Sequence, residues 1–480
     1  MATEIRTIAL VSLGCPKNLV DSERMLGLLA ADGLTLTAEA EEADAVVINT
    51  CGFLEASKVE SMEEIHRAIR LKETGKCRRV VVAGCLVQRH KTALLAEAPG
   101  IDRLVGVFDR EHIVEAVRGN GASGGEGHFL GKYHDLSNRL AKEANLESAK
   151  QTKTARLPVF EDDRGRLRLT PRHYAFLRIS EGCNQGCAFC TIPTIRGPMR
   201  SKPIDHVLAE ARELAADGAV ELNLIGQDTT SYGTDIGYEP GLGGLLKTLD
   251  RQLKDVHWLR LMYAYPSCFT DEMIRAIADS PRLAKYIDIP LQHINDQMLT
   301  MMKRRVTRKQ IETLLEKLRK WIPGITIRTT FIAGSPGETE AQHQELVQFV
   351  RDFGFDMMGV FPYSPEPGTP MGRMNGQVSE AEKISRVEEL MLAQQQIAFE
   401  KSNRKIGQDI DVLIDRRSEN AKRWVGRTSG QAPEIDSVTF VEGPGLHAGK
   451  IVTAHVCGSD GYDLLAELPK VRSRSLKVVG

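Results

Sequence analysis

The run Glu181-Gly182-Cys183-Asn184-Gln185-Gly186-Cys187-Ala188-Phe189-Cys190 brings three cysteines within eight residues. Three thiolates at this spacing can bind three irons of a cubane iron–sulfur cluster, which is normally held by four cysteines. The fourth iron would then be open to a substrate or cofactor. A zinc site needs a fourth ligand, for which His173 is the nearest upstream candidate, and a disulfide would leave one thiol unpaired. A cluster with an open iron therefore fits the run best.

The Cys-x3-Cys-x2-Cys spacing, with the aromatic Phe189 before the last cysteine, resembles the radical S-adenosylmethionine (SAM) superfamily. The resemblance implies that Cys183, Cys187 and Cys190 hold a 4Fe–4S cluster and that SAM chelates its open iron.

Strand-like and helix-like segments alternate around this run. Apolar runs predict strands at 174–181, 219–225, 258–264, 285–290, 325–332 and 357–363. Helical patterns follow at 203–217, 241–253, 270–279, 308–321 and 340–353. Six β-α units predict an open (β/α)6 partial barrel, with its site at the carboxyl ends of the strands.

The strand ends supply candidate contacts for SAM. These candidates are Gly226, Gln227 and Asp228 after the second strand, Gln292 after the fourth, Gly334 and Gly337 after the fifth, and Phe189 beside the adenine. An acidic or amide group at 226–228 could hold the amino group of SAM, and glycines allow close approach of the backbone. A turn between strand and helix explains each of these positions equally well. Arg196 and Arg200 either bind carboxylates, which arginine suits, or belong to a solvated basic loop.

Three further cysteines follow three strand-like runs near the N-terminus. Cys15 follows 8–11, Cys51 follows 45–48 and Cys85 follows 80–83, with helical patterns at 18–31 and 57–71. This β-α-β-α-β alternation predicts a doubly wound parallel sheet. Ligands of such sheets bind at the carboxyl ends of the strands, so the three cysteines should converge there and hold a second open cluster. Alternatively, each is a small buried residue that closes its strand.

Composition limits the remaining possibilities. The chain has 480 residues, 42% of them hydrophobic, which allows about three domains. A net charge of −1 gives no overall attraction to nucleic acid or membranes. We see no apolar run long enough for a membrane span and no signal peptide at Met1–Arg6. Nine cysteines without an export signal indicate reduced thiols in the cytoplasm; of these, Cys77, Cys268 and Cys457 belong to neither trio.

The C-terminal part begins after a predicted helix at 379–405. Short strand-like runs at 410–414, 424–428, 438–441, 451–455 and 462–465 predict a small β-barrel of the oligonucleotide-binding type. Its basic excess is slight, so it could contact RNA or dock a protein. We expect domains at 1–117, 169–400 and 401–475, joined at 118–168 by a linker with a glycine-rich stretch at 119–125 and a polar tract at 142–156.

Taken together, the chain resembles the methylthiotransferases, which combine an N-terminal three-cysteine domain, a radical-SAM core and a C-terminal TRAM barrel. The stretches 12–23, 227–233 and 432–436 are similar to the branch that modifies an aspartate of ribosomal protein S12. The branch that modifies adenosine in transfer RNA remains the nearest alternative. A non-catalytic iron–sulfur carrier or ribosome-binding factor is an alternative of another class.

The resemblance implies a division of labour between two 4Fe–4S clusters. The one at Cys183, Cys187 and Cys190 cleaves SAM to a 5′-deoxyadenosyl radical that takes hydrogen from the aspartate β-carbon. The one at Cys15, Cys51 and Cys85 carries sulfur, which a separate SAM methylates. We therefore expect S12, free or within the small ribosomal subunit, an electron donor protein and a sulfur source as partners, and no membrane.

Overall fold

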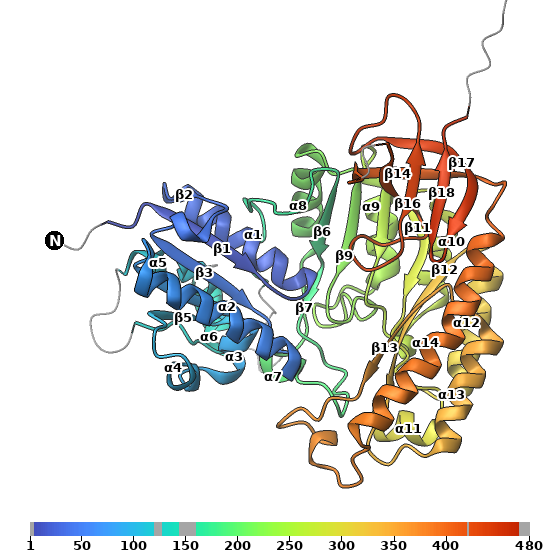
Figure 1. The fold of residues 1–480 in the computed structure, drawn as a ribbon, viewed down its shortest axis with the longest axis horizontal. Helices are drawn as coiled ribbons and strands as arrows, with labels where there is room; N and C mark the ends of the chain where they lie inside the picture. The colour runs from blue at the N-terminus through green and yellow to red at the C-terminus, as the bar shows by residue number, and fades with distance from the viewer. Residues whose placement is uncertain (1–3, 120–126, 144–159, 420–421, 470–480) are drawn as a thin grey trace, which may run out of the picture.

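A computed structural model describes residues 4–119, 127–143, 160–419 and 422–469. The chain folds into three consecutive parts (Figure 1). Residues 120–125 of the expected glycine-rich linker and 144–156 of the expected polar tract lie outside the described residues. Helix α6 (Tyr133–Glu143), which the sequence did not predict, lies between these two gaps.

The first part is a parallel sheet with the strand order β2-β1-β3-β4-β5. Its strands are β1 (Thr7–Ser12), β2 (Thr35–Leu36), β3 (Ala45–Thr50), β4 (Arg79–Gly84) and β5 (Arg103–Val105). Helices α1 (Pro16–Ala31) and α5 (Ile113–Arg118) cover one face, and α2 (Glu55–Thr74), α3 (Cys85–His90) and α4 (Ala93–Glu97) cover the other. Separate apolar clusters on the two faces confirm the doubly wound architecture.

The second part contains six parallel strands in the order β13-β12-β11-β10-β9-β6. They are β6 (Tyr174–Arg178), β9 (Glu221–Ile225), β10 (Trp258–Leu261), β11 (Leu283–Asp288), β12 (Thr326–Ala333) and β13 (Met357–Pro362). The helices are α7 (Ile192–Arg196), α8 (Ile204–Ala216), α9 (Gly241–Gln252), α10 (Asp271–Asp279), α11 (Asp296–Met301), α12 (Arg308–Trp321) and α13 (Glu340–Phe353). A short antiparallel pair, β7 (Ser180–Glu181) and β8 (Arg200–Ser201), flanks the cysteine run. The expected partial barrel is confirmed.

Helix α14 (Glu380–Asn403) packs on β13 and leads to the third part. There β14 (Asp409–Arg417), β15 (Trp424–Thr428), β16 (Thr439–Glu442), β17 (Ile451–Asp460) and β18 (Asp463–Glu467) close into a barrel. The predicted small barrel is therefore confirmed, with all five strands at the expected places.

The C-terminal barrel contacts strands of the partial barrel through polar side chains. Tyr174 donates a hydrogen bond of 2.7 Å to Glu434, and Tyr286 donates one of 2.8 Å to Asp436. Ala432 packs in one apolar cluster with Tyr174 and Tyr286. The stretch 432–436 thus fastens the third part to the second.

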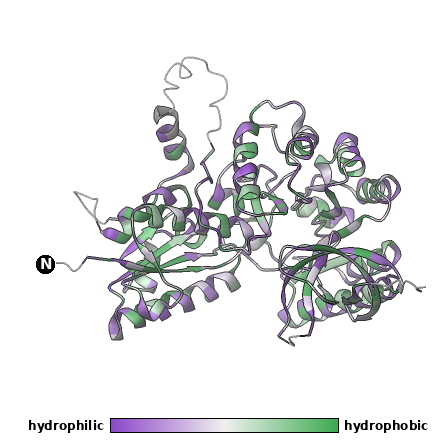
Figure 2. Cartoon of the chain, turned by 90° about the horizontal axis from the view of Figure 1, so that it is seen from above, coloured by the Kyte–Doolittle hydropathy of each residue, from purple (hydrophilic) through white to green (hydrophobic). Residues whose placement is uncertain are grey.

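Hydrophobic residues gather on the strands and on the sides of the helices that face them (Figure 2). This distribution is typical of helices that cover a sheet on one side and meet water on the other. Among the described residues, no helix combines the length and the apolar character needed to cross a membrane.

Candidate functional site

The N-terminal trio lies where three neighbouring strands end. Cys15 follows β1 as the N-cap of α1, Cys51 follows β3, and Cys85 opens α3 directly after β4. β1, β3 and β4 are adjacent in the parallel sheet, so their carboxyl ends share one edge. The connections are tight: a Cβ added to Gly14, whose φ is +87°, would lie 2.8 Å from the Cβ of Cys51.

The central trio lies in the loop between β7 and α7, beyond the carboxyl end of β6. The loop folds back because Gly182 and Gly186 adopt φ values of +75° and +66°. Cys183 donates its N–H to the carbonyl of Gly197, and Cys190 donates to that of Cys187. The loop backbone therefore holds three thiols on one turn of chain.

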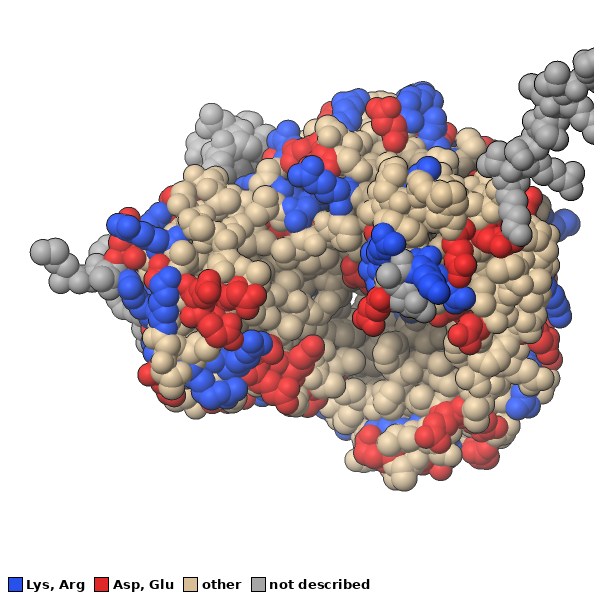
Figure 3. Space-filling model, turned by 45° about the horizontal axis from the view of Figure 1, so that its top comes forward, with Lys and Arg blue, Asp and Glu red and all other residues tan. Residues whose placement is uncertain are grey.

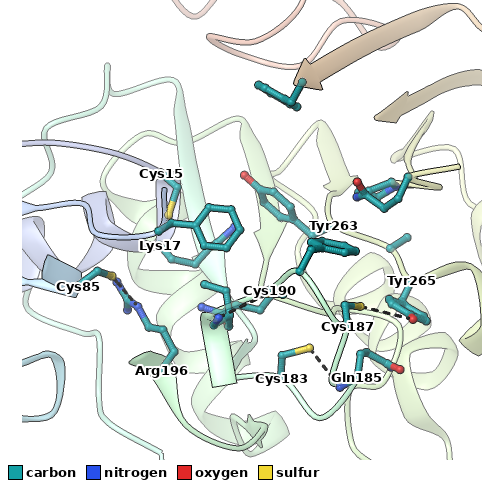
Figure 4. Close-up of a pocket in the computed structure, with 18 of the residues that line it drawn as sticks. Cys15, Lys17, Cys85, Cys183, Gln185, Cys187, Cys190, Arg196, Tyr263 and Tyr265 are labelled. Carbon is teal, nitrogen blue, oxygen red and sulfur yellow. Dashed lines mark hydrogen bonds between the residues drawn. The ribbon is translucent and has the colours of Figure 1, made fainter. Parts of the chain in front are cut away.

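All six cysteines line one cavity of about 470 Å³ between the first and second parts of the chain. Figure 4 shows Cys15 and Cys85 on one side of this cavity and Cys183 and Cys187 on the other. The cysteines of the N-terminal trio are 36 and 34 positions apart in the sequence, yet they line one pocket. They face the central trio, which belongs to the second part of the chain.

The described residues contain no three Cys, His, Asp or Glu side chains that could hold a single metal ion. A cubane cluster needs more widely spaced thiolates than a single metal ion, because each thiolate binds its own iron. His173, the candidate fourth zinc ligand, instead pairs with Asp415 of the C-terminal barrel at 2.8 Å.

Nitrogen donors point at the sulfur atoms, as they do around iron–sulfur clusters. The backbone N–H groups of Gln185 and Ile192 donate to Cys183 and Cys190 at 3.5 and 3.4 Å. Arg304 donates to Cys187 at 3.3 Å. Such donors stabilise negative charge on sulfur, so this set of thiols fits two clusters, each held by three cysteines.

Arg196 makes the corresponding contact in the N-terminal trio, although it comes from α7 of the second part. Its Nε and Nη2 lie 3.3 and 3.2 Å from the sulfur of Cys85, and its Nη1 donates to Asp21 at 2.7 Å. The guanidinium also pairs with Glu181. The carboxylates that Arg196 binds are therefore the protein's own, and one side chain connects the two halves of the pocket.

Burial opposes ionisation of these thiols in the absence of iron. It raises the pKa of Cys85 to about 12, although Arg196 acts in the opposite direction. Burial likewise raises the pKa of Cys183 to about 11 and that of Cys190 to about 12. These side chains are consequently neutral thiols until metal binding displaces their protons.

The candidate SAM contacts divide into two groups. Phe189, Gln227 and Gln292 line the cavity together with the cysteines. Gly226, Asp228, Gly334 and Gly337 do not line it. Asp228 is buried and accepts hydrogen bonds from Gln185, Thr230 and Ser231, so it orients Gln185, which does line the cavity. A Cβ on Gly334 would meet the side chain of Lys383 at 2.3 Å, so its small size serves packing against α14.

Several cavity residues did not emerge from the sequence as candidates. Among them are Lys17, Tyr263, Tyr265 and Arg304. The Arg304 guanidinium lies 4.1 Å from the ring centroid of Tyr265, whose hydroxyl donates to the Arg304 carbonyl. Lys17 follows Cys15 by two residues, and this proximity was the only signal available for it. No pattern in the chain marks the other three.

One face of the molecule carries both positively and negatively charged side chains (Figure 3). On the face shown in Figure 3, Lys and Arg side chains alternate with Asp and Glu, and the central hollow is bounded mainly by uncharged residues. This face therefore offers no single-sign patch of the kind that attracts nucleic acid.

Comparison with known proteins covers the same three parts. Family models match at residues 7–106 (uncharacterized protein family UPF0004), 177–350 (radical SAM superfamily) and 406–468 (TRAM domain). The chain is 41% identical over 464 residues to "Ribosomal protein uS12 methylthiotransferase RimO" of Desulforamulus reducens, covering 96% of this chain and 99% of that protein. It is 39% identical over 469 residues to the protein of the same name of Geobacter sulfurreducens, covering 98% and 100%.

A solved structure shares the fold. The radical S-adenosylmethionine methyltransferase TsrM from Kitasatospora setae, with cobalamin and a [4Fe-4S] cluster bound, superposes with a TM-score of 0.53 at 17% identity. The match covers 77% of each chain. At this identity the likeness concerns the arrangement of helices and strands alone.

Proposed function

This chain belongs to the family of ribosomal protein uS12 methylthiotransferases, and we propose that it transfers a methylthio group to the β-carbon of an aspartate of uS12. The observation that carries the proposal is the shared cavity: six thiols in two trios, from two domains, surround one space. Iron–sulfur clusters and SAM follow from membership of the family.

In this proposal Cys183, Cys187 and Cys190 hold the cluster that binds SAM, and Cys15, Cys51 and Cys85 hold the second. With SAM, the two clusters supply a radical strong enough to remove hydrogen from an unactivated carbon and a sulfur atom to replace it. Acid–base chemistry is poorly suited to this step, because an ionised carboxylate does little to stabilise a carbanion beside it.

The chain's own residues prepare the space for that chemistry. Arg304 and Tyr265 hold each other in position beside Cys187 through a hydrogen bond and a cation–π contact. Arg196 fixes Cys85 relative to the loop of the central trio. Phe53, Phe189 and Ile192 give the cavity apolar walls that exclude water.

We place the domains at 1–117, 169–400 and 401–475, with 118–168 as the linker.

The chemistry also needs electrons and sulfur, so we propose an electron donor protein and a sulfur source as further partners, acting in the cytoplasm where uS12 is assembled. Mass spectrometry of uS12 from cells with and without this gene tests the proposal. We expect a methylthio mass increase on one aspartate that disappears with the gene. The same shift on transfer RNA nucleosides, with uS12 unchanged, would favour the transfer RNA alternative.

Two variants test the division of labour between the trios. Cys187→Ala should reduce 5′-deoxyadenosine formation to background, because the cluster that cleaves SAM loses a ligand. Cys51→Ala should retain that formation and lose methylthio transfer. Cys457→Ser, an exposed thiol outside the cavity, serves as control and should retain both. Transfer by Cys51→Ala protein of verified iron content would contradict the assignment.

A further inference from the structure

Lys17 places a buried cation in the cavity. The residue is 7% exposed, and its Nζ lies 3.2 Å from the ring centroid of Tyr263. Figure 4 shows its side chain on the side of Cys15, directed toward Tyr263. No carboxylate of the described residues forms an ion pair with it. Glu181, whose carboxylate acts electrostatically on Lys17, already forms ion pairs with Arg178 and Arg196.

Among the described residues, the other buried Lys and Arg side chains form ion pairs with carboxylates, except Arg304, which contacts the Cys187 sulfur and the Pro290 carbonyl. Arg178 pairs with Asp21 and Asp163, and Lys202 pairs with Asp163. Arg260 pairs with Glu221. A buried cation without a carboxylate beside it is costly, and one that lines a cavity can be neutralised by an anion that binds there. Lys17 is therefore suited to a negatively charged group that enters from outside.

The position of Lys17 is held from both sides. It is the second residue of α1, two positions after the N-cap Cys15. Tyr263 follows β10 of the second part with a φ of +59°, and its backbone is fixed by Asp288 and Thr229. The cation–π contact thus spans the boundary between the two domains and keeps the ammonium between the trios.

We infer that Lys17 binds the carboxylate of the aspartate that is modified, and is a specificity-determining residue of the cavity. This inference rests on the proposed function. The β-carbon of an aspartate is one bond from its carboxyl carbon, so holding the carboxylate fixes the carbon that must meet both SAM and the sulfur donor. Charge-assisted hydrogen bonds from an ammonium also favour a carboxylate over the neutral amide of the same shape.

Binding measurements on the anaerobic holoenzyme test this role. Small ribosomal subunits reconstituted with uS12 carrying either the native Asp or Asn at the modified position are titrated onto the enzyme. We expect the native chain to bind the Asp form at least about tenfold more tightly, and Lys17→Met to bind both forms within about twofold. Lys17→Arg should keep a preference in the native direction.

Arg24→Met is the matched control, because it removes one positive charge from the same helix. Arg24 pairs with Glu111 away from the cavity. It should keep the native discrimination, which separates local binding from a general change of charge. Iron content and circular dichroism are measured for every variant.

The outcomes distinguish the inference from the proposed function. Failure of the native enzyme to bind or modify either subunit would overturn the proposed function itself. A preference for Asp of about fivefold or more in Lys17→Met, or no preference in fully iron-loaded Lys17→Arg, would overturn the inference alone. Loss of iron from Lys17→Met with the preference retained would also overturn it, because Lys17 would then only balance the charge at Cys15.

Discussion

At the residue scale, the sulfur atoms depend on their immediate neighbours. Gly14 shows this most directly, because it lies against Cys51 with a positive φ. The sequence predicted which thiols gather, since strand ends are readable from apolar runs. It did not predict Arg196 or Arg304 as their hydrogen-bond donors, because nothing in a linear pattern tells which arginine will fold back onto a given sulfur.

Gly14→Ala should disturb the N-terminal trio specifically. The new methyl would lie 2.8 Å from Cys51 Cβ and 3.1 Å from its sulfur, and alanine at a φ of +87° adds about 1 kcal/mol of strain. We expect reconstituted protein to hold about half the iron of the native chain, because one of two cubanes is lost. Gly33→Ala is the control: its φ is +83°, but nothing lies within 4 Å of the added methyl. Full iron content in Gly14→Ala would refute the prediction.

His293 should make the second part sensitive to mild acid. Burial, with smaller contributions from His343 and Arg386, lowers its pKa from 6.5 to about 3. The unfolded chain therefore binds more protons between these values. The contribution of neutral His293 to the free energy of unfolding is complete above pH 6.5 and is lost as the pH falls toward 3. At pH 5 the loss is roughly 2 kcal/mol.

Denaturant unfolding at pH 7 and pH 5, followed by tryptophan fluorescence, measures this loss. His293→Asn removes the titrating group while keeping an acceptor for the N–H of Asn295, which His293 now provides. The variant should lose less stability than the native chain between the two pH values. An equal loss in both proteins would show that another group is responsible.

At the scale of elements, long periodic segments were predicted well, but several short elements were missed. The expected strand at 357–363 and helix at 340–353 match β13 and α13 almost residue for residue. The short elements β2, α3, α4, β5 and α11 were missed. Six residues or fewer cannot display a period of 3.6, so tertiary contacts determine whether such a segment becomes helical.

Helix α13 begins with a reciprocal cap that should stabilise its first turn. The Thr339 hydroxyl accepts from the N–H of Gln342, whose side chain accepts from the N–H of Thr339. Thr339→Ala removes one of these bonds and should cost about 1 kcal/mol. Hydrogen exchange at the start of α13 should accelerate about fivefold. Thr313→Ala, in the exposed middle of the neighbouring α12, is the control and should leave exchange unchanged in α13.

At the scale of the whole molecule, the order of domains was predicted but their docking was not. The interface between the first two parts is a buried group of charges, namely Asp21, Arg110, Asp163, Arg178, Glu181 and Arg196. These residues are scattered over some 175 positions of the chain. Individually each resembles a surface charge, so only the folded arrangement reveals that they hold the two trios at one cavity.

Asp21 is the centre of this group, and its removal should loosen the docking. Its two oxygens accept from Arg110, Arg178 and Arg196 at 2.7, 2.8 and 2.7 Å. Asp21→Asn leaves one buried positive charge uncompensated, which costs about 3–5 kcal/mol. Asp32→Asn is the control, since Asp32 pairs with Arg118 near the surface and contributes at most about 1 kcal/mol.

Acid should also loosen this docking in the native chain, between pH 4 and pH 2. Although burial opposes it, pairing with Arg178, Arg196 and Arg110 lowers the pKa of Asp21 from 3.8 to about 2. A carboxyl with a depressed folded pKa stabilises fully above the unfolded value and loses that contribution as the pH falls through the folded one. About 2 kcal/mol should therefore disappear between pH 4 and pH 2. Hydrogen exchange in α1, compared with that in β14–β18 of the C-terminal barrel, measures the docking. In Asp21→Asn protein α1 should already exchange faster at pH 6, and its further acceleration in acid should be smaller than in the native chain. Equal acid responses in the two proteins would exclude Asp21 as the group that couples proton binding to domain docking.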